Sequence, residues 1–308
     1  MRWGDFRRSD NVEDRTGGAP EGSGGGGGLP FGGMRIGGGA LILIVIVGWL
    51  FGINPIEMLG LLGGGTGGPA TQSAPGYGPQ SGTGTNGVPP AALQQSATNK
   101  DFSARVLGDT EDVWGAIFQA MGSRYEPPKL VLFRGSTPSA CGRAEAAVGP
   151  FYCPADRDVY LDTTFFGELH TRFGAPGDFA QAYVIAHEVG HHVQNLLGTM
   201  QKFDAQMQRS DPRSANALSV RLELQADCYA GVWAFFAAKR SLIDTNDIDG
   251  GLQAAAAVGD DRIQKMTQGY VAPDSFTHGS AAQRAHWFRT GLQSGDLRDC
   301  NTFGARSP

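Results

Sequence analysis

Residues 186–194 read Ala186-His-Glu-Val-Gly-His-His-Val-Gln194 and contain the pattern H-E-x-x-H. In an α-helix, residues i and i+4 lie on one face, so the imidazoles of His187 and His191 can reach one metal ion. Glu188 is rotated by about 100° from His187 and can deprotonate a metal-bound water. Neutral imidazoles suit zinc, which lowers the pKa of bound water to about 7. The segment therefore predicts a zinc centre built on one helix.

The glycine inside this motif is a second signal. Gly190 in the middle of a helix costs about 1 kcal/mol relative to alanine, so its presence needs a structural reason. We expect another backbone element to approach closely at this position. An H-E-x-x-H match arises by chance in a chain of this composition with a probability of roughly 0.003, and the alternative is a helix with two hydrogen-bonded histidines.

A catalytic zinc ion needs a third protein ligand and an open coordination position. Positions 194 and 197 hold Gln and Leu, so no histidine continues the motif along the helix. We predict Glu223, on the following long helix, as the third ligand. Asp227 lies one turn later and is expected to accept a hydrogen bond from a ligand imidazole. The alternative for Glu223 is a solvated surface residue, which its apolar neighbours disfavour.

Five segments resemble the bacterial putative neutral zinc metallopeptidase family, and H-E-x-x-H followed by E-x-x-A-D is similar to the gluzincin zinc peptidases. These segments are Gly149-Pro-Phe-Tyr-Cys-Pro154, Asp158-Val-Tyr-Leu-Asp162, Ala186 to Gln194, Glu223-Leu-Gln-Ala-Asp-Cys-Tyr-Ala-Gly231 and His278-Gly-Ser-Ala-Ala-Gln-Arg-Ala-His-Trp-Phe288. The resemblance implies a zincin-like fold, the zinc ligands His187, His191 and Glu223, and Glu188 as catalytic base. It also implies peptide or protein substrates and an N-terminal membrane anchor.

Functional or structural roles are also expected for three more residues. In gluzincins a downstream His or Tyr donates to the oxyanion of the tetrahedral intermediate, and His278 is the candidate for this catalytic role. Its alternative is a surface or helix-capping residue. His192 points away from the metal face and is expected to be structural. Tyr160 lies on an expected edge strand of the kind that pairs with an extended peptide, but a packed strand tyrosine is the preferred interpretation.

The first third of the chain differs in composition from the rest, because 27 of the 47 glycines lie in the first 100 residues. Residues 1–35 contain few large apolar groups and are predicted to form a disordered tail. Residues 36–62 begin with an uncharged apolar run and are predicted to be a transmembrane anchor. Residues 63–99 are rich in Gly, Ser, Thr and Pro and carry no charge before Lys100, which predicts a flexible linker.

Basic residues predict the orientation of the anchor. No Lys or Arg follows it until Lys100, whereas five arginines precede it: Arg2, Arg7, Arg8, Arg15 and Arg35. The positive-inside rule then places the N-terminus in the cytoplasm and residues 100–308 outside the inner (cytoplasmic) membrane. A cleaved signal peptide and a buried core helix are the alternatives, which the late start of the apolar run and its glycine-rich flanks disfavour.

Residues 100–308 suffice for one domain, for which we predict an α+β fold that is mainly helical with a small sheet. Helices are expected over 102–121, 178–197, 212–240, 247–265 and 280–294, and strands over 130–134 and 158–162. Asp178 is the expected cap of the second helix. Asp211, followed by proline, is the expected cap of the third.

All four cysteines lie in this domain. An even number in an exported domain predicts disulfides, and we expect the pairs Cys141–Cys153 and Cys228–Cys300. The alternatives are four buried thiols or a zinc site made of all four cysteines. The lack of any C-x-x-C spacing disfavours such a zinc site.

Charge and motif together limit the functional class. The net charge of −5 and the 18% of charged residues argue against a protein that binds nucleic acid. The resemblance implies a membrane-anchored zinc metallopeptidase that contacts membrane lipid through one helix and cleaves peptide bonds with a zinc-activated water. The alternatives are a catalytically inactive zinc-binding or partner-binding module, and a zinc amidase that acts on cell-wall material.

Overall fold

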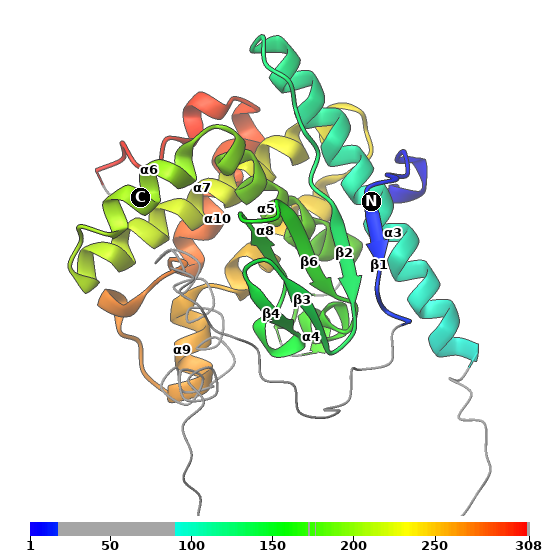
Figure 1. The fold of residues 1–308 in the computed structure, drawn as a ribbon, viewed down its shortest axis with the longest axis horizontal. Helices are drawn as coiled ribbons and strands as arrows, with labels where there is room; N and C mark the ends of the chain where they lie inside the picture. The colour runs from blue at the N-terminus through cyan, green and yellow to red at the C-terminus, as the bar shows by residue number, and fades with distance from the viewer. Residues whose placement is uncertain (18–89, 172, 176, 307–308) are drawn as a thin grey trace, which may run out of the picture.

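The computed structural model describes residues 1–17, 90–171, 173–175 and 177–306. Within these ranges a mainly helical body packs against small sheets, so the predicted α+β class is confirmed (Figure 1). No helix in these ranges is long and apolar enough to cross a membrane. The transmembrane anchor predicted over 36–62 lies outside the described residues.

A four-stranded sheet forms one side of the domain, with the strand order β1-β2-β6-β5. Its strands are β1 (Val12–Asp14), β2 (Leu130–Phe133), β5 (Phe151–Cys153) and β6 (Asp158–Asp162). β2 pairs in parallel with β1 and β6, whereas β5 runs antiparallel to β6 and forms an edge. The interior strands β2 and β6 are almost wholly buried and were both predicted. A separate hairpin, β3 (Ser136–Ser139) and β4 (Gly142–Glu145), follows β2.

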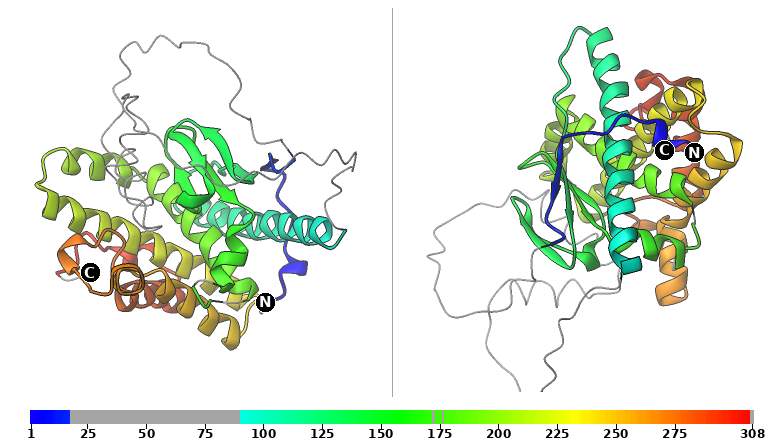
Figure 2. Two further views of the ribbon diagram at one scale, coloured as in Figure 1. Left: turned by 90° about the horizontal axis from the view of Figure 1, so that it is seen from below. Right: turned by 90° about the vertical axis from the view of Figure 1, so that its right-hand side faces the viewer.

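Helix α5 (Asp178–Leu196) occupies the centre of the domain (Figures 1 and 2). It contacts the helices α3 (Pro90–Ala120), α7 (Pro212–Lys239) and α8 (Thr245–Ala257), and also the strands β5 and β6. Most of its side chains are buried. The H-E-x-x-H motif therefore lies on the most enclosed helix of the described chain.

The remaining helices are α4 (Phe165–Thr171), α6 (Thr199–Met207), α9 (Asp260–Gln268) and α10 (Ala281–Ser294). Asp211 caps α7 as predicted, because its side chain accepts from the backbone nitrogens of the next turn. The cap predicted at Asp178 is wrong: Gly177 occupies that position, and Asp178 accepts instead from the indole nitrogen of Trp3.

The single helix predicted over 247–265 is also wrong, because α8 and α9 are separate. They are divided at Gly259, where a β-carbon would lie 2.3 Å from the backbone nitrogen of Ala281. Position 259 has no room for a side chain, so glycine at this position allows the backbone to pack closely against the start of α10. Hydrophobic spacing along the sequence does not report such a contact.

Residues 1–17, here called the N-terminal arm, are ordered and belong to the domain, so the predicted disordered tail is wrong for this part. A short 3-10 helix (Trp3–Asp5) contacts α3, and β1 extends the sheet beyond β2. Phe6 is only 3% exposed. The arm buries its few apolar groups on distant elements, which its own composition does not reveal.

The rest of the predicted tail, residues 18–35, lies outside the described residues. α3 begins at Pro90, so the last ten residues of the predicted linker are helical.

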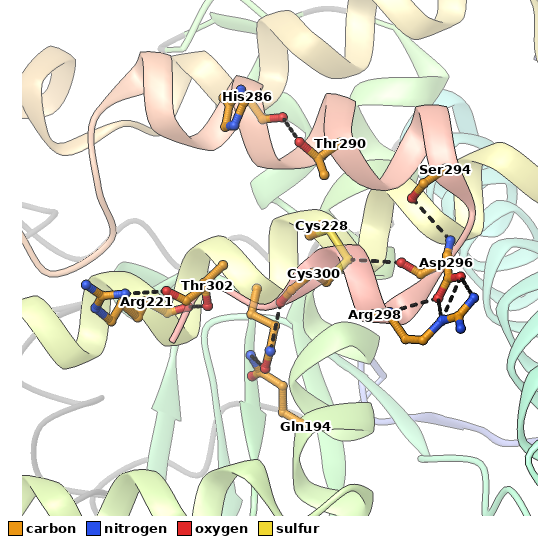
Figure 3. Close-up of a disulfide and its surroundings, with 11 residues drawn as sticks. Gln194, Arg221, Cys228, His286, Thr290, Ser294, Asp296, Arg298, Cys300 and Thr302 are labelled. Carbon is orange, nitrogen blue, oxygen red and sulfur yellow. Dashed lines mark hydrogen bonds and ion pairs between the residues drawn. A yellow bond between two sulfur atoms is a disulfide. The ribbon is translucent and has the colours of Figure 1, made fainter. Parts of the chain in front are cut away.

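Both predicted disulfides are present. Cys141–Cys153 joins the turn after β3 to the end of β5. Cys228–Cys300 joins α7 to a short 3-10 helix (Leu297–Cys300) near the C-terminus (Figure 3). The second bridge fixes the C-terminal segment to α7, at a point where α7 packs closely against α10.

Candidate metal centre

His187 and His191 lie one turn apart on α5, and the centroids of their rings are 4.8 Å apart. Glu223 reaches both from α7: its Oε2 lies 3.2 Å from His187 Nε2, and its Oε1 lies 3.4 Å from His191 Nε2. All three side chains are buried. The structure therefore gathers the three residues predicted as ligands into one cluster.

The spacing within this cluster fits a tetrahedral zinc ion. Zinc binds imidazole nitrogen and carboxylate oxygen at about 2.0–2.2 Å, so two ligand atoms at the tetrahedral angle stand roughly 3.3–3.5 Å apart. The two nitrogen-to-oxygen separations of 3.2 and 3.4 Å are close to that value. Two imidazoles and one carboxylate are also a donor set that zinc takes in catalytic sites.

Asp227 orients the ring of His187. Its Oδ1 lies 2.9 Å from His187 Nδ1, which is the position expected from the sequence. Arg284, on α10, donates to both oxygens of this carboxylate at 2.9 and 3.0 Å, and the hydroxyl of Tyr183 also bonds to it. Burial raises the pKa of Asp227, but the charges of Arg284 and His187 outweigh burial, so the pKa is lowered. An ionised Asp227 accepts the Nδ1 proton and leaves Nε2 to face Glu223.

Gln194 orients the second imidazole. Its amide nitrogen donates to the carbonyl of Leu222 at 2.7 Å, so its oxygen faces His191 Nδ1 at 2.8 Å. Gln194 also donates to Gln225 Oε1 at 3.2 Å, and the amide nitrogen of Gln225 donates to the carbonyl of Cys300 at 3.0 Å. Both imidazoles thus have Nδ1 occupied and Nε2 directed at the same carboxylate.

The close approach predicted at Gly190 is confirmed. The backbone of α7 passes Gly190 at Ala226, which lies between Glu223 and Asp227 in the sequence. Because no side chain separates the two helices there, both acidic side chains of α7 come within reach of the histidines on α5.

Glu188 lies beside the cluster in the wall of a pocket that His187, His191, Glu223 and His278 also line. Burial raises the pKa of Glu188, and the neighbouring histidines only partly offset this effect. A carboxylate with a raised pKa next to a metal site is suited to accept a proton from water.

His278 lines the same pocket and is buried, so it is not a surface residue. Asp260, at the start of α9, accepts from the backbone nitrogens of Thr277, His278 and Gly279 at 2.7, 2.7 and 3.0 Å. The other oxygen of Asp260 lies 3.2 Å from His278 Nδ1. Burial lowers the pKa of His278, but the carboxylates of Asp260 and Glu223 outweigh burial and raise it.

The rest of the pocket wall is largely apolar. Its lining includes Phe151, Phe165, Val184, Met200 and Ile263. The polar groups are therefore concentrated at the cluster, and the remaining wall suits an apolar side chain of a ligand.

His192 and Tyr160 lie outside the pocket. His192 Nε2 donates to the carbonyl of Glu126 at 2.6 Å, its Nδ1 lies 3.1 Å from the hydroxyl of Tyr152, and burial lowers its pKa to about 4. Tyr160 stacks on Phe151 and is buried, as the preferred interpretation expected. Its strand, β6, is an interior strand and not the expected edge.

Four residues around the cluster were not identified from the sequence: Tyr183, Gln194, Asp260 and Arg284. Tyr183 precedes His187 by four residues and Gln194 follows His191 by three, so helical spacing could have identified both. Asp260 and Arg284 come from elements whose positions depend on tertiary packing, and no sequence spacing indicates them.

Comparison of the sequence with known protein families identifies one matching family. The model of the family described as "Putative neutral zinc metallopeptidase" matches residues 1–303. The chain is 45% identical over 306 residues to uncharacterized protein YpfJ of Escherichia coli K12, which covers 99% of each chain. It is 45% identical over 218 residues to uncharacterized protein Rv2575 of Mycobacterium tuberculosis H37Rv, which covers 67% of this chain and 72% of that protein. No solved structure matches the chain significantly.

Proposed function

Because the chain belongs to this neutral zinc metallopeptidase family, we propose that it hydrolyses peptide bonds with a zinc ion held by His187, His191 and Glu223. One observation carries the proposal: the three converging ligand side chains line a pocket whose wall also holds Glu188. The pairing of α5 with α7 beside a small mixed sheet supports a zincin-like fold. When bound, zinc supplies a Lewis acid that polarises the scissile carbonyl and lowers the pKa of water.

Glu188 is the proposed catalytic base. It takes a proton from the attacking water and passes that proton to the nitrogen of the leaving amine. Its raised pKa supports this role, since the carboxyl must accept a proton and then release it in each cycle.

His278 is the proposed hydrogen-bond donor to the oxyanion of the tetrahedral intermediate. Its Nδ1 faces Asp260, so the ring presents Nε2 as its other nitrogen. Because the Nδ1 proton is used in the bond to Asp260, only the protonated ring has a second proton to donate. The raised pKa of His278 favours that form.

The substrate is proposed to be a peptide or protein segment in an extended conformation. β5 is an edge strand, and its residues Phe151 and Tyr152 line the pocket beside the cluster. A peptide backbone that pairs with such an edge passes its carbonyl groups along the cluster. The apolar wall favours a large apolar side chain next to the cleaved bond.

The domain is proposed to lie outside the cytoplasm and to be held at the inner membrane by residues 36–62. The two disulfides support an oxidising compartment. The pocket over the ligands favours catalysis over a structural zinc site, because structural sites have all coordination positions filled by protein.

The test is peptide hydrolysis by the purified full chain with and without a chelator, beside the Glu188→Gln variant. We expect Glu188→Gln to keep one zinc per chain and to lose hydrolysis of a peptide library by at least 100-fold. Undiminished cleavage by Glu188→Gln would refute the base assignment. Zinc binding without cleavage of any peptide would favour a non-catalytic module, and cleavage of cell-wall fragments alone would favour an amidase.

A further inference from the structure

The N-terminal arm is joined to the domain by backbone hydrogen bonds along its length. Near its start, the nitrogen of Arg2 donates to the carbonyl of Leu242 at 2.8 Å. At its middle, the nitrogen of Ser9 donates to the carbonyl of Ala104 in α3 at 2.9 Å. Towards its end, β1 pairs with β2 over three residues. The arm is therefore built into the sheet and does not merely lie on the surface.

A buried carboxylate of α3 depends on the arm. Glu111 is 9% exposed, and its oxygens accept from Arg7 Nη2 at 2.6 Å, from Ser9 Oγ at 2.6 Å and from Asn11 Nδ2 at 2.7 Å. All three donors belong to the arm. Removal of the arm would leave a buried charge without these partners, which is strongly unfavourable.

A glycine of α3 makes room for the arm. A β-carbon at Gly108 would lie 2.2 Å from the carbonyl oxygen of Arg7 and 2.9 Å from the nitrogen of Ser9. Gly115, two turns later on the same helix, has no neighbour within 4 Å of such a β-carbon. The close contact is therefore specific to the position where the arm crosses α3.

Three of the arginines that predicted a cytoplasmic N-terminus have partners in this fold. Arg7 pairs with Glu111 and Asp112 at 2.6 and 2.9 Å, and Arg8 pairs with Asp101 at 3.1 Å. Arg15 donates to Thr137 and Pro138, both at 3.0 Å. The fold thus explains the basic character of the arm without reference to membrane orientation.

From these contacts we infer that the N-terminal arm and the metal-binding domain lie in the same compartment. Asp14, near the end of the arm, lies 2.5 Å from Lys100 of α3, and in Figure 1 β1 ends near the start of α3. A helix that crosses the hydrocarbon core once separates its two flanks by about 30 Å of lipid. A single crossing between the arm and the domain would therefore place these contacting residues on opposite sides of the bilayer.

The same compartment follows if the arm of one chain packs on the domain of another chain, because the two must still meet on one side of the membrane. The inference therefore disagrees with the predicted orientation, in which the N-terminus is cytoplasmic and residues 100–308 lie outside the inner membrane.

The compartment is tested with two full-length variants that carry a recognition site for a specific protease, one within 24–28 and one within 78–88. Each is exposed to protease added outside intact spheroplasts and, separately, to the same protease expressed in the cytoplasm. Cleavage of both sites from the same side supports the inference, whichever side it is. Cleavage of one site from outside and of the other only from the cytoplasm overturns it. Neither outcome depends on peptidase activity.

Docking of the arm is tested with the matched variants Gly108→Ala and Gly115→Ala. Both add one methyl group to the same helix, but only the first collides with the arm. We expect Gly108→Ala alone to lower the melting temperature and to increase trypsin cleavage after Arg7, Arg8 and Arg15 at least tenfold. Equal behaviour of the two variants would show that the arm does not occupy this position.

Discussion

Gly190 of α5 faces the backbone of Ala226 of α7, and a β-carbon on Gly190 would lie 2.9 Å from the carbonyl oxygen and 3.2 Å from the α-carbon of Ala226. The two helices that supply the cluster are therefore too close at this point to leave room for a side chain on Gly190. Glu223 and Asp227 lie on either side of Ala226 in the sequence and reach the two ring nitrogens of His187, Nε2 and Nδ1 respectively. The distance between α5 and α7 thus sets the geometry of the cluster.

Gly190→Ala should weaken zinc binding and lower stability, because the new methyl group forces α7 away from α5. Overpacking of this kind costs about 1–3 kcal/mol of unfolding free energy. The control is Gly250→Ala in α8, where a β-carbon finds no atom within 4 Å and helix propensity improves. Urea unfolding and zinc competition with a coloured chelator measure both effects. Wild-type zinc affinity in Gly190→Ala would contradict the account.

Asp227→Asn should lower zinc affinity about 10–100-fold, the usual effect of changing a residue that orients a ligand histidine. The amide lacks the charge that holds the Nδ1 proton of His187 and leaves the buried Arg284 without its carboxylate. Tyr183→Phe is the matched control, since it removes one hydrogen bond to Asp227 but retains the carboxylate. Calorimetric titration with zinc should rank Asp227→Asn well below Tyr183→Phe, and equal affinities would speak against the orienting role.

Asp260→Asn should move the basic limb of the pH–rate profile to lower pH. The negative charge of Asp260 raises the pKa of His278, so its removal lowers that pKa, and the protonated donor is lost at a lower pH. Asp261→Asn is the control, because Asp261 accepts from the backbone nitrogen of Ala281 at 2.7 Å, a contact that leaves His278 untouched. The profile of kcat/KM against pH reports the shift. An unmoved basic limb in Asp260→Asn would exclude His278 as the titrating donor.

Loss of the two disulfides should destabilise the domain unequally. The Cys228–Cys300 bridge closes a loop with a sequence separation of 72, and the Cys141–Cys153 bridge one of 12. Chain entropy assigns them about 4 and about 3 kcal/mol respectively. Urea unfolding of the two double-alanine variants should show the larger loss for the 228–300 pair. The opposite ranking would indicate that the long-range bridge adds little to the constraint on the unfolded chain.

Local spacing in the sequence carried most of the information about the cluster. The i and i+4 relation of His187 and His191, and the one-turn step from Glu223 to Asp227, depend only on helix geometry, and the structure places all four side chains together. The interior strand β2 was predictable because its continuous burial matches a continuous apolar run, whereas β6 was predicted from the alternation of polar and apolar residues in Asp158-Val-Tyr-Leu-Asp162.

Contacts between distant segments were not predictable in the same way. The arm looks disordered by composition because the groups that partner it, such as Glu111 and Lys100, lie about a hundred residues away. Asp260 and Arg284 reach the pocket through the packing of α9 and α10. The split between α8 and α9 depends on the contact of Gly259 with Ala281. Periodicity within one segment contains no record of these neighbours.

Diffraction from crystals of the full-length chain loaded with one equivalent of zinc, measured on both sides of the zinc absorption edge, tests the central claim most directly. We expect a single strong anomalous peak about 2.0–2.2 Å from His187 Nε2, His191 Nε2 and a carboxylate oxygen of Glu223. A peak at other side chains, or the absence of any peak at this cluster, would contradict the assignment of the zinc centre.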